Sequence, residues 1–168
     1  MADPNRHDRL QPSLLDRLTD NAPEAKRESL DQQVLTMQQL RAGVLRDLAW
    51  LLNTTNLEAV DDLDGLKLVS ASTLNYGVPG FTGSVASTDR VGGLEQALAT
   101  AIRQFEPRIK PGTVRVRARE QGGASGPKLV FEIQGELWAQ PVPQQLFLET
   151  SVDITTRLTV VTEARMRG

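Results

Sequence analysis

The chain has 168 residues, with 19 basic and 21 acidic side chains and a formal net charge of −2. This length suits one domain with a substantial core, and the near balance of charge gives no electrostatic reason to expect nucleic acid or an anionic membrane as the main partner. No apolar run reaches membrane-spanning length, so we expect no direct insertion into a membrane. The absence of cysteine excludes disulfides and thiolate chemistry, and His7 alone argues against histidine catalysis and multi-histidine metal sites. We therefore expect no metal or other cofactor.

The N-terminal part, residues 1–28, mixes Asp, Arg, Asn and Pro and predicts a polar segment ahead of a domain that spans residues 29–168. It lacks an apolar signal core, so the expected compartment is the cytoplasm. One short apolar patch interrupts the segment, where Ser13 is a candidate N-cap and the next leucines share one side of a short helix: Leu14, Leu15 and Leu18. This helix either packs on its own domain or docks on another subunit, and the sequence leaves both interpretations open.

The middle of the chain carries two longer helical patterns, over residues 28–53 and 94–105. The apolar spacing of the first includes Leu30, Val34, Met37, Val44, Leu48 and Leu51, and that of the second Leu94, Leu98, Ile102 and Phe105. Gly43 lies inside the first helix and indicates a kink or a close approach. Between the two helices, residues 66–69 predict a short strand and residues 75–80 a turn.

Four strand patterns follow, over residues 114–119, 129–138, 145–154 and 158–161. If the first two form a hairpin, Arg117 faces Glu132, and the outward arginines meet acids on an ordinary solvated face rather than nucleic acid. The exposed edge of the sheet is either residues 146–154 or residues 158–161. The order of elements predicts an α+β fold, with N-terminal helices and one central helix packed on a largely antiparallel sheet that the C-terminal half mainly forms.

The junction between the second helix and the first strand carries Glu106, Pro107 and Arg108. A proline disfavours helical backbone at the residue before it, so the helix should end near Phe105. On extended backbone the two charged side chains, two positions apart, would project to the same side. They can then bond to each other or form a socket for a partner.

Catalytic chemistry is weakly supported. A glycosidase places two carboxyl groups roughly 5–10 Å apart. Glu132 and Glu136 share a strand face, but at about 3.3 Å per residue their backbones lie roughly 13 Å apart. The sequence contains no nucleophile elbow, phosphate loop or dinucleotide fingerprint.

Several motifs, in order along residues 13–162, resemble the TssE family of type VI secretion baseplate subunits. These are LRDLAWLLNT at 45–54, TLNYGVP at 73–79, AIRQFEPRI at 101–109 and FEIQGELW at 131–138. Gly80 departs from the family, where an acidic residue is expected after the proline. TssE is similar to a wedge protein of contractile-tail phages, and members of that group have often been labelled lysozymes.

The resemblance implies a non-catalytic structural subunit at the cytoplasmic side of the inner membrane. Its implied partners are TssF, TssG, TssK and the tail sheath subunits, and its sheet would be a platform on which sheath polymerisation starts. Glu106, Pro107 and Arg108 would be the assembly site. The alternative is a lysozyme-like hydrolase that cleaves peptidoglycan.

Overall fold

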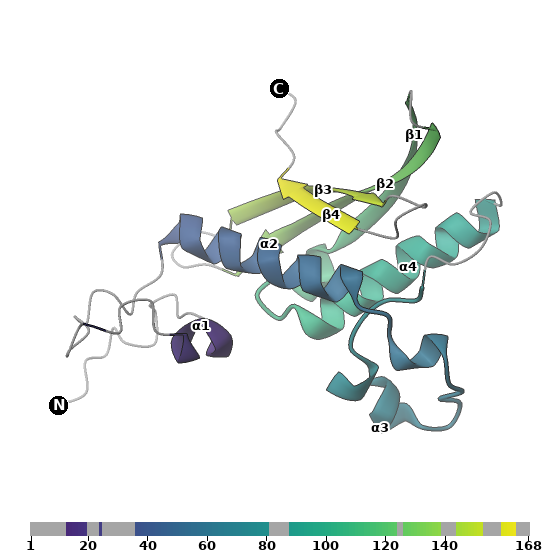
Figure 1. Cartoon of the computed structure of the whole chain (residues 1–168), viewed down its shortest axis with the longest axis horizontal. Coiled ribbons are helices and arrows are strands. Elements are labelled where there is room, and N and C mark those ends of the chain that lie inside the picture. The colour runs from purple at the N-terminus through teal and green to yellow at the C-terminus, as the bar shows by residue number, and fades with distance from the viewer. Residues whose placement is uncertain are drawn as a thin grey trace.

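The computed structural model describes residues 13–19, 24, 36–80, 88–123, 126–138, 144–152 and 159–163. Over these ranges the chain forms an α+β fold, as predicted (Figure 1). A helix with the length and apolar character needed to cross a membrane does not occur in these ranges. The predicted boundary at residue 28 lies outside the described residues.

The sheet is an antiparallel meander of four strands in the order β1-β2-β3-β4. Its strands are β1 (Arg115–Gly123), β2 (Gly126–Leu137), β3 (Gln144–Val152) and β4 (Thr159–Glu163). The predicted hairpin is confirmed, because Arg117 is the register partner of Glu132. The outward arginines of β1 are exposed, and Arg119 forms an ion pair of 3.0 Å with Glu132.

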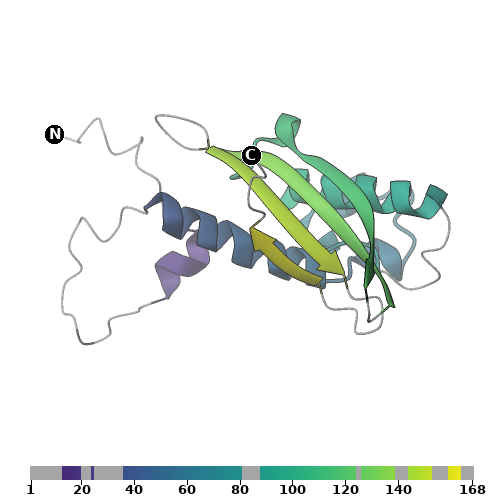
Figure 2. The same ribbon diagram turned by 90° about the horizontal axis from the view of Figure 1, so that it is seen from above.

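Two long helices cover one face of this sheet, with α4 (Thr88–Phe105) packed on β1 and α2 (Met37–Asn53) packed on β4 (Figures 1 and 2). The alternation along β2 points its odd-numbered side chains at the helices, which is why they form the centre of the core. The most fully buried side chains are Phe131, Leu48, Leu51, Ile102, Ile109, Ile133, Leu137, Val44 and Val114.

Capping residues determine where α2 begins, and a proline determines where α4 ends. α2 begins at Met37 rather than near residue 28, because Thr36 and Gln39 form a reciprocal capping box there. The predicted core positions Leu30 and Val34 lie outside the described residues. α4 begins earlier than predicted, at Thr88, and ends at Phe105 as the following proline requires.

The connection between α2 and α4 contains short helical turns: η3 (Leu57–Ala59), α3 (Lys67–Ser70) and η4 (Thr73–Asn75). The strand predicted over residues 66–69 is wrong, since Leu66 is the N-cap of α3 and the other three residues lie within this helix. The buried Asn75 side chain holds the connection together, because its oxygen accepts from the Glu58 N–H and its nitrogen donates to the Ser70 carbonyl. These hydrogen bonds stabilise the connection without pairing to a strand of the sheet.

The edges of the described sheet are β1 and β4. The proposal that residues 146–154 form an edge is therefore wrong, because β3 pairs with β2 on one side and with β4 on the other. The other candidate, residues 158–161, overlaps β4, which is an edge strand.

Candidate functional site

The Glu106-Pro107-Arg108 segment is a tight turn at the end of α4. The Glu106 N–H donates to the Ile102 carbonyl at 2.9 Å, and the Ile109 N–H donates to the Glu106 carbonyl at 3.1 Å. The expectation of extended backbone is therefore wrong. Pro107 occupies the second position of the turn, where its fixed φ is favourable, and the turn brings the flanking charges together.

Glu106 and Arg108 bind each other directly. The Arg108 Nε and Nη2 donate to the two Glu106 carboxylate oxygens at 2.7 and 2.5 Å, and the Arg108 backbone N–H donates to Oε1 at 3.1 Å. Glu106 is only 3% exposed, whereas the Arg108 side chain is 22% exposed. The pair is therefore bidentate and mostly desolvated, unlike a surface salt bridge.

Arg108 also contacts α2. Its Nη2 donates to Asp47 Oδ2 at 2.6 Å. Burial by itself would lower the pKa of Arg108, but the hydrogen bonds and charges of Glu106 and Asp47 outweigh it and hold that pKa above its ordinary value. The guanidinium thus joins the end of α4 to the middle of α2.

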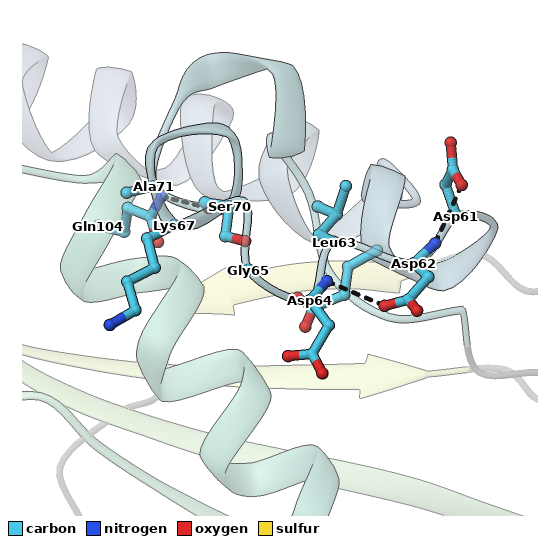
Figure 3. Close-up of a pocket in the computed structure, with 10 residues that line it drawn as sticks. Asp61, Asp62, Leu63, Asp64, Gly65, Lys67, Ser70, Ala71 and Gln104 are labelled. Atoms are coloured by element: carbon cyan, nitrogen blue, oxygen red, sulfur yellow. Dashed lines mark hydrogen bonds between the residues drawn. The ribbon is translucent and has the colours of Figure 1, made fainter.

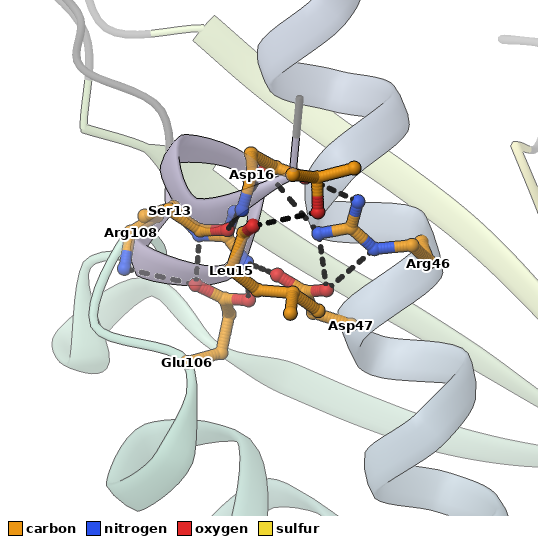
Figure 4. Close-up of polar contacts among 8 residues, drawn as sticks. Ser13, Leu15, Asp16, Arg46, Asp47, Glu106 and Arg108 are labelled. Atoms are coloured by element: carbon orange, nitrogen blue, oxygen red, sulfur yellow. Dashed lines mark hydrogen bonds and ion pairs between the residues drawn. The ribbon is translucent and has the colours of Figure 1, made fainter. Parts of the chain in front are cut away.

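The chain of charges continues from α2 to α1 (Leu14–Leu18), as Figure 4 shows. Arg46 binds Asp47 Oδ1 through Nε at 2.9 Å, and its Nη1 donates to Asp16 Oδ1 at 2.5 Å. The hydrogen bond from Arg46 is the main cause that lowers the pKa of Asp16. Negative and positive groups therefore alternate from Glu106 to Asp16.

The sequence predictions at α1 and at Gly43 are confirmed in their local geometry. Ser13 caps α1, because its Oγ accepts from the Asp16 N–H at 3.3 Å. Gly43 is a point of close approach, since a Cβ built there would lie 3.5 Å from Arg108 Nη1 and 3.7 Å from Asp16 Oδ2. The bare helix surface at Gly43 lets both charged groups lie against α2.

The charged chain borders a pocket of about 500 Å³, which brings together two predicted sets of residues. Pro107 is exposed at this pocket, and α1 contributes Leu14 and Leu15, which are 71% and 47% exposed. Leu18 does not line the pocket and is 74% exposed. Further apolar walls come from Leu48, Trp50, Leu51, Tyr76 and Phe105.

Sequence reasoning missed Asp16, Arg46 and Asp47 as members of the site. Asp47 and Arg46 lie within the motif at residues 45–54, so the motif contained a signal that was not used. Asp16 sits on the polar side of the predicted leucine helix, and only the fold reveals that Arg46 lies opposite it.

A second depression, of about 510 Å³, is lined by several acidic residues around the turn before α3 (Figure 3). Two of these carboxylates accept hydrogen bonds within their own loop, because Asp61 accepts from the Asp62 N–H and Asp62 accepts from the Asp64 N–H. Among the described residues, no group of three acidic or histidine side chains is arranged to hold a metal ion.

The arrangement does not support the hydrolase alternative. In the described part of the chain, the acids that the sequence considered are each bound to a cation: Glu106 to Arg108, Glu132 to Arg119 and Glu136 to Lys110, the last at 2.9 Å. The strand spacing of Glu132 and Glu136 leaves them too far apart for glycosidase chemistry. Fold and site together define an α+β protein with a preorganised charged turn beside a partly apolar pocket.

Comparison with known protein families identifies that protein class. A family model described as "Baseplate wedge protein gp25" matches residues 38–142, and the chain belongs to this family. The match includes α2 from its second residue onward, together with α4, the Glu106-Pro107-Arg108 turn, β1 and β2. Neither a curated protein nor a solved structure matches the chain. Membership of a baseplate wedge family gives the chain a structural role in a baseplate.

Proposed function

We propose that the chain is the TssE subunit of a type VI secretion baseplate, where it joins TssF, TssG and TssK. The baseplate wedge family match supports the general role. The more specific assignment rests on the four TssE-like motifs described above. In the assembled state the subunit would lie in the cytoplasm at the inner face of the inner membrane.

The Glu106-Pro107-Arg108 turn is the proposed contact with the wedge partners. The observation that carries this proposal is the difference between two neighbouring residues of the turn. Glu106 is buried and paired with Arg108, whereas Pro107 is exposed beside the pocket. The internal ion pairs fix the backbone before a partner arrives, which lowers the entropy that binding must overcome. The apolar pocket walls supply surface for a partner to bury.

The outer edge of β4 is the proposed platform for sheath polymerisation. An edge strand offers backbone groups to which a neighbouring strand can add. The Asn53 side chain already bonds the N–H and the carbonyl of Thr159, at 2.8 and 2.9 Å, at the start of β4. In an antiparallel strand the next groups that point the same way belong to Val161, so strand addition would begin there.

The test is a pull-down of the tagged chain from its native cells, with the variants Pro107→Glu and Pro111→Glu. Both prolines are exposed, Pro107 in a turn and Pro111 at the start of the short 3-10 helix η5 (Pro111–Thr113), but only Pro107 lies at the pocket. We expect wild type and Pro111→Glu to retain TssF and TssG, and Pro107→Glu to lose them while it melts as the control does. Equal retention by both variants would refute the assignment of the site. Failure of the wild type to retain any baseplate protein would refute the proposed function.

A further inference from the structure

The way in which α1 is attached differs from that of the two long helices, α2 and α4. The apolar core contains side chains from α2, α4 and the sheet, and none of the α1 side chains that the structure describes belongs to it. The leucines of α1 stay largely exposed, at 71% for Leu14, 47% for Leu15 and 74% for Leu18. Burial of apolar surface, which normally holds a helix against its domain, therefore contributes little here.

Among the described side chains of α1, the Asp16 carboxylate makes the polar contacts with α2. It accepts hydrogen bonds from Arg46 at 2.5 and 3.3 Å, and the Ser13 hydroxyl donates to the same carboxylate at 2.8 Å. Both charged side chains are about one third exposed, at 36% for Arg46 and 29% for Asp16. Exposed ion pairs of this kind are weak and screened by salt.

The seat of this carboxylate is defined by Arg46, Gly43 and Arg108. The missing side chain at Gly43 leaves room for a carboxylate oxygen, since a Cβ there would lie 3.7 Å from Asp16 Oδ2 and 3.5 Å from Arg108 Nη1. Arg108 also adds an attractive charge for Asp16. Any acidic side chain that can lie along α2 at this point meets the same two guanidinium groups.

Sequence distance sets only a wide limit on where α1 can lie, because residues 20–35 separate it from the cap of α2 and a chain of that many residues spans at most roughly 50 Å. α1 also forms one wall of the pocket beside Pro107, through Leu14 and Leu15. Departure of α1 would therefore open the pocket next to the proposed assembly turn.

We propose that the Arg46–Gly43–Arg108 seat is an exchangeable carboxylate site. Asp16 fills it in the isolated chain, and an acidic side chain of a wedge partner replaces Asp16 in the assembly, so that α1 is released with its leucines free. This inference rests on the proposed function and adds the chemistry of the partner. The complementary charge of the two arginines, and the carboxylate that already occupies the seat, identify the partner group as an Asp or Glu.

The first experiment measures attachment of α1 in the full-length chain. Because the chain has no cysteine, nitroxide labels can be placed on Leu18→Cys in α1 and on Gln96→Cys at an exposed position of α4. We expect a narrow distribution of label distances at low salt. The distribution should broaden in an added Asp16→Asn background and at about 1 M salt, where the Debye length is about 3 Å. A distribution that neither change broadens would overturn the proposal.

The second experiment measures retention of a TssF–TssG complex by full-length variants. Asp16→Asn removes the internal competitor, so we expect roughly two- to five-fold tighter retention. Arg46→Gln also frees α1 but removes half of the seat, so retention should fall. Asp64→Asn and Arg117→Gln are charge controls away from the pocket and should match wild type. Only exchange of carboxylates at this site predicts that retention rises with Asp16→Asn and falls with Arg46→Gln, although both changes release α1.

The outcomes separate this proposal from the proposed function. If wild type retains the complex but Asp16→Asn retains it equally or less well, α1 is not a competitor, exchange is refuted and the wedge role stands. If wild type retains no wedge protein, the proposed function fails and the exchange fails with it.

Discussion

Replacement of Arg108 by alanine would leave the Glu106 carboxylate buried without its principal cation. Arg108 supplies two side-chain hydrogen bonds to Glu106, and Glu106 is only 3% exposed. Truncation of one partner of a buried ion pair typically costs about 3–5 kcal/mol, because the remaining charge is neither paired nor hydrated.

Two features of the turn reduce that cost. The Arg108 side chain is 22% exposed, so water can enter after truncation, and the backbone N–H of residue 108 still donates to Glu106. We therefore expect Arg108→Ala to lower the free energy of unfolding by about 2–4 kcal/mol. Glu106→Ala should cost about 1 kcal/mol less, because Arg108 retains Asp47 as a partner.

Urea denaturation of both single variants and of the double variant forms the assay. The double variant leaves neither charge of the pair buried without its partner. Its loss of unfolding free energy should therefore be smaller than the sum of the losses of the two single variants, with a coupling energy of about 1–3 kcal/mol. Arg117→Ala is the matched control, since this exposed arginine lies on the solvated face of β1, and it should cost about 0.5 kcal/mol or less. Additive losses at Glu106 and Arg108 would refute the reasoning that the two side chains form one desolvated unit.

Three further predictions concern other parts of the described chain. Gly77→Ala should destabilise the chain by at least about 2 kcal/mol more than Gly65→Ala does, as measured in thermal melts. Both glycines have positive φ, but only at Gly77 would a Cβ clash with a backbone atom, the carbonyl oxygen of Thr54. Equal losses of stability would contradict this steric account. Burial, aided by two nearby carboxylates, raises the pKa of Tyr76, the single tyrosine of the chain. The midpoint of the phenolate absorbance in the folded chain should therefore lie above pH 10.0, and a native midpoint equal to that of the unfolded chain would count against this account. The hydrogen bond from Arg46 lowers the pKa of Asp16 below its ordinary value of 3.8. Attachment of α1 should therefore be complete above pH 3.8 and should be lost as the pH falls through the lowered pKa. Release of α1 already at about pH 5, in the label-distance measurement, would show that another group holds α1.

Much of the fold was predictable because local rules and burial agree. The alternation of residues in β1 and β2 predicted the pairing of Arg117 with Glu132, since a slip of one residue would turn Phe131 out of the core. The proline rule predicted the end of α4 at Phe105. The segment at residues 66–69 was mispredicted as a strand because a short apolar run does not distinguish strand from helix without its tertiary partners.

The site was only partly predictable, because its ion pairs join distant parts of the chain. Arg108 and Asp47 are 61 positions apart, and Arg46 and Asp16 are 30 positions apart. No local periodicity reports such contacts. The sequence left open whether Glu106 and Arg108 bind each other or a partner. The structure shows that they bind each other, and the interface role of the turn stays a prediction.

Site-specific photocrosslinking in native cells tests the central claim most directly. A photoreactive amino acid placed at position 107 would report which protein lies against the turn, and one at position 111 provides the control at the other exposed proline. A chain that joins baseplate wedges through this turn should crosslink from position 107 to a baseplate subunit and not from position 111. Crosslinks to a baseplate subunit from position 111 alone, or to no baseplate protein from either position, would contradict the account.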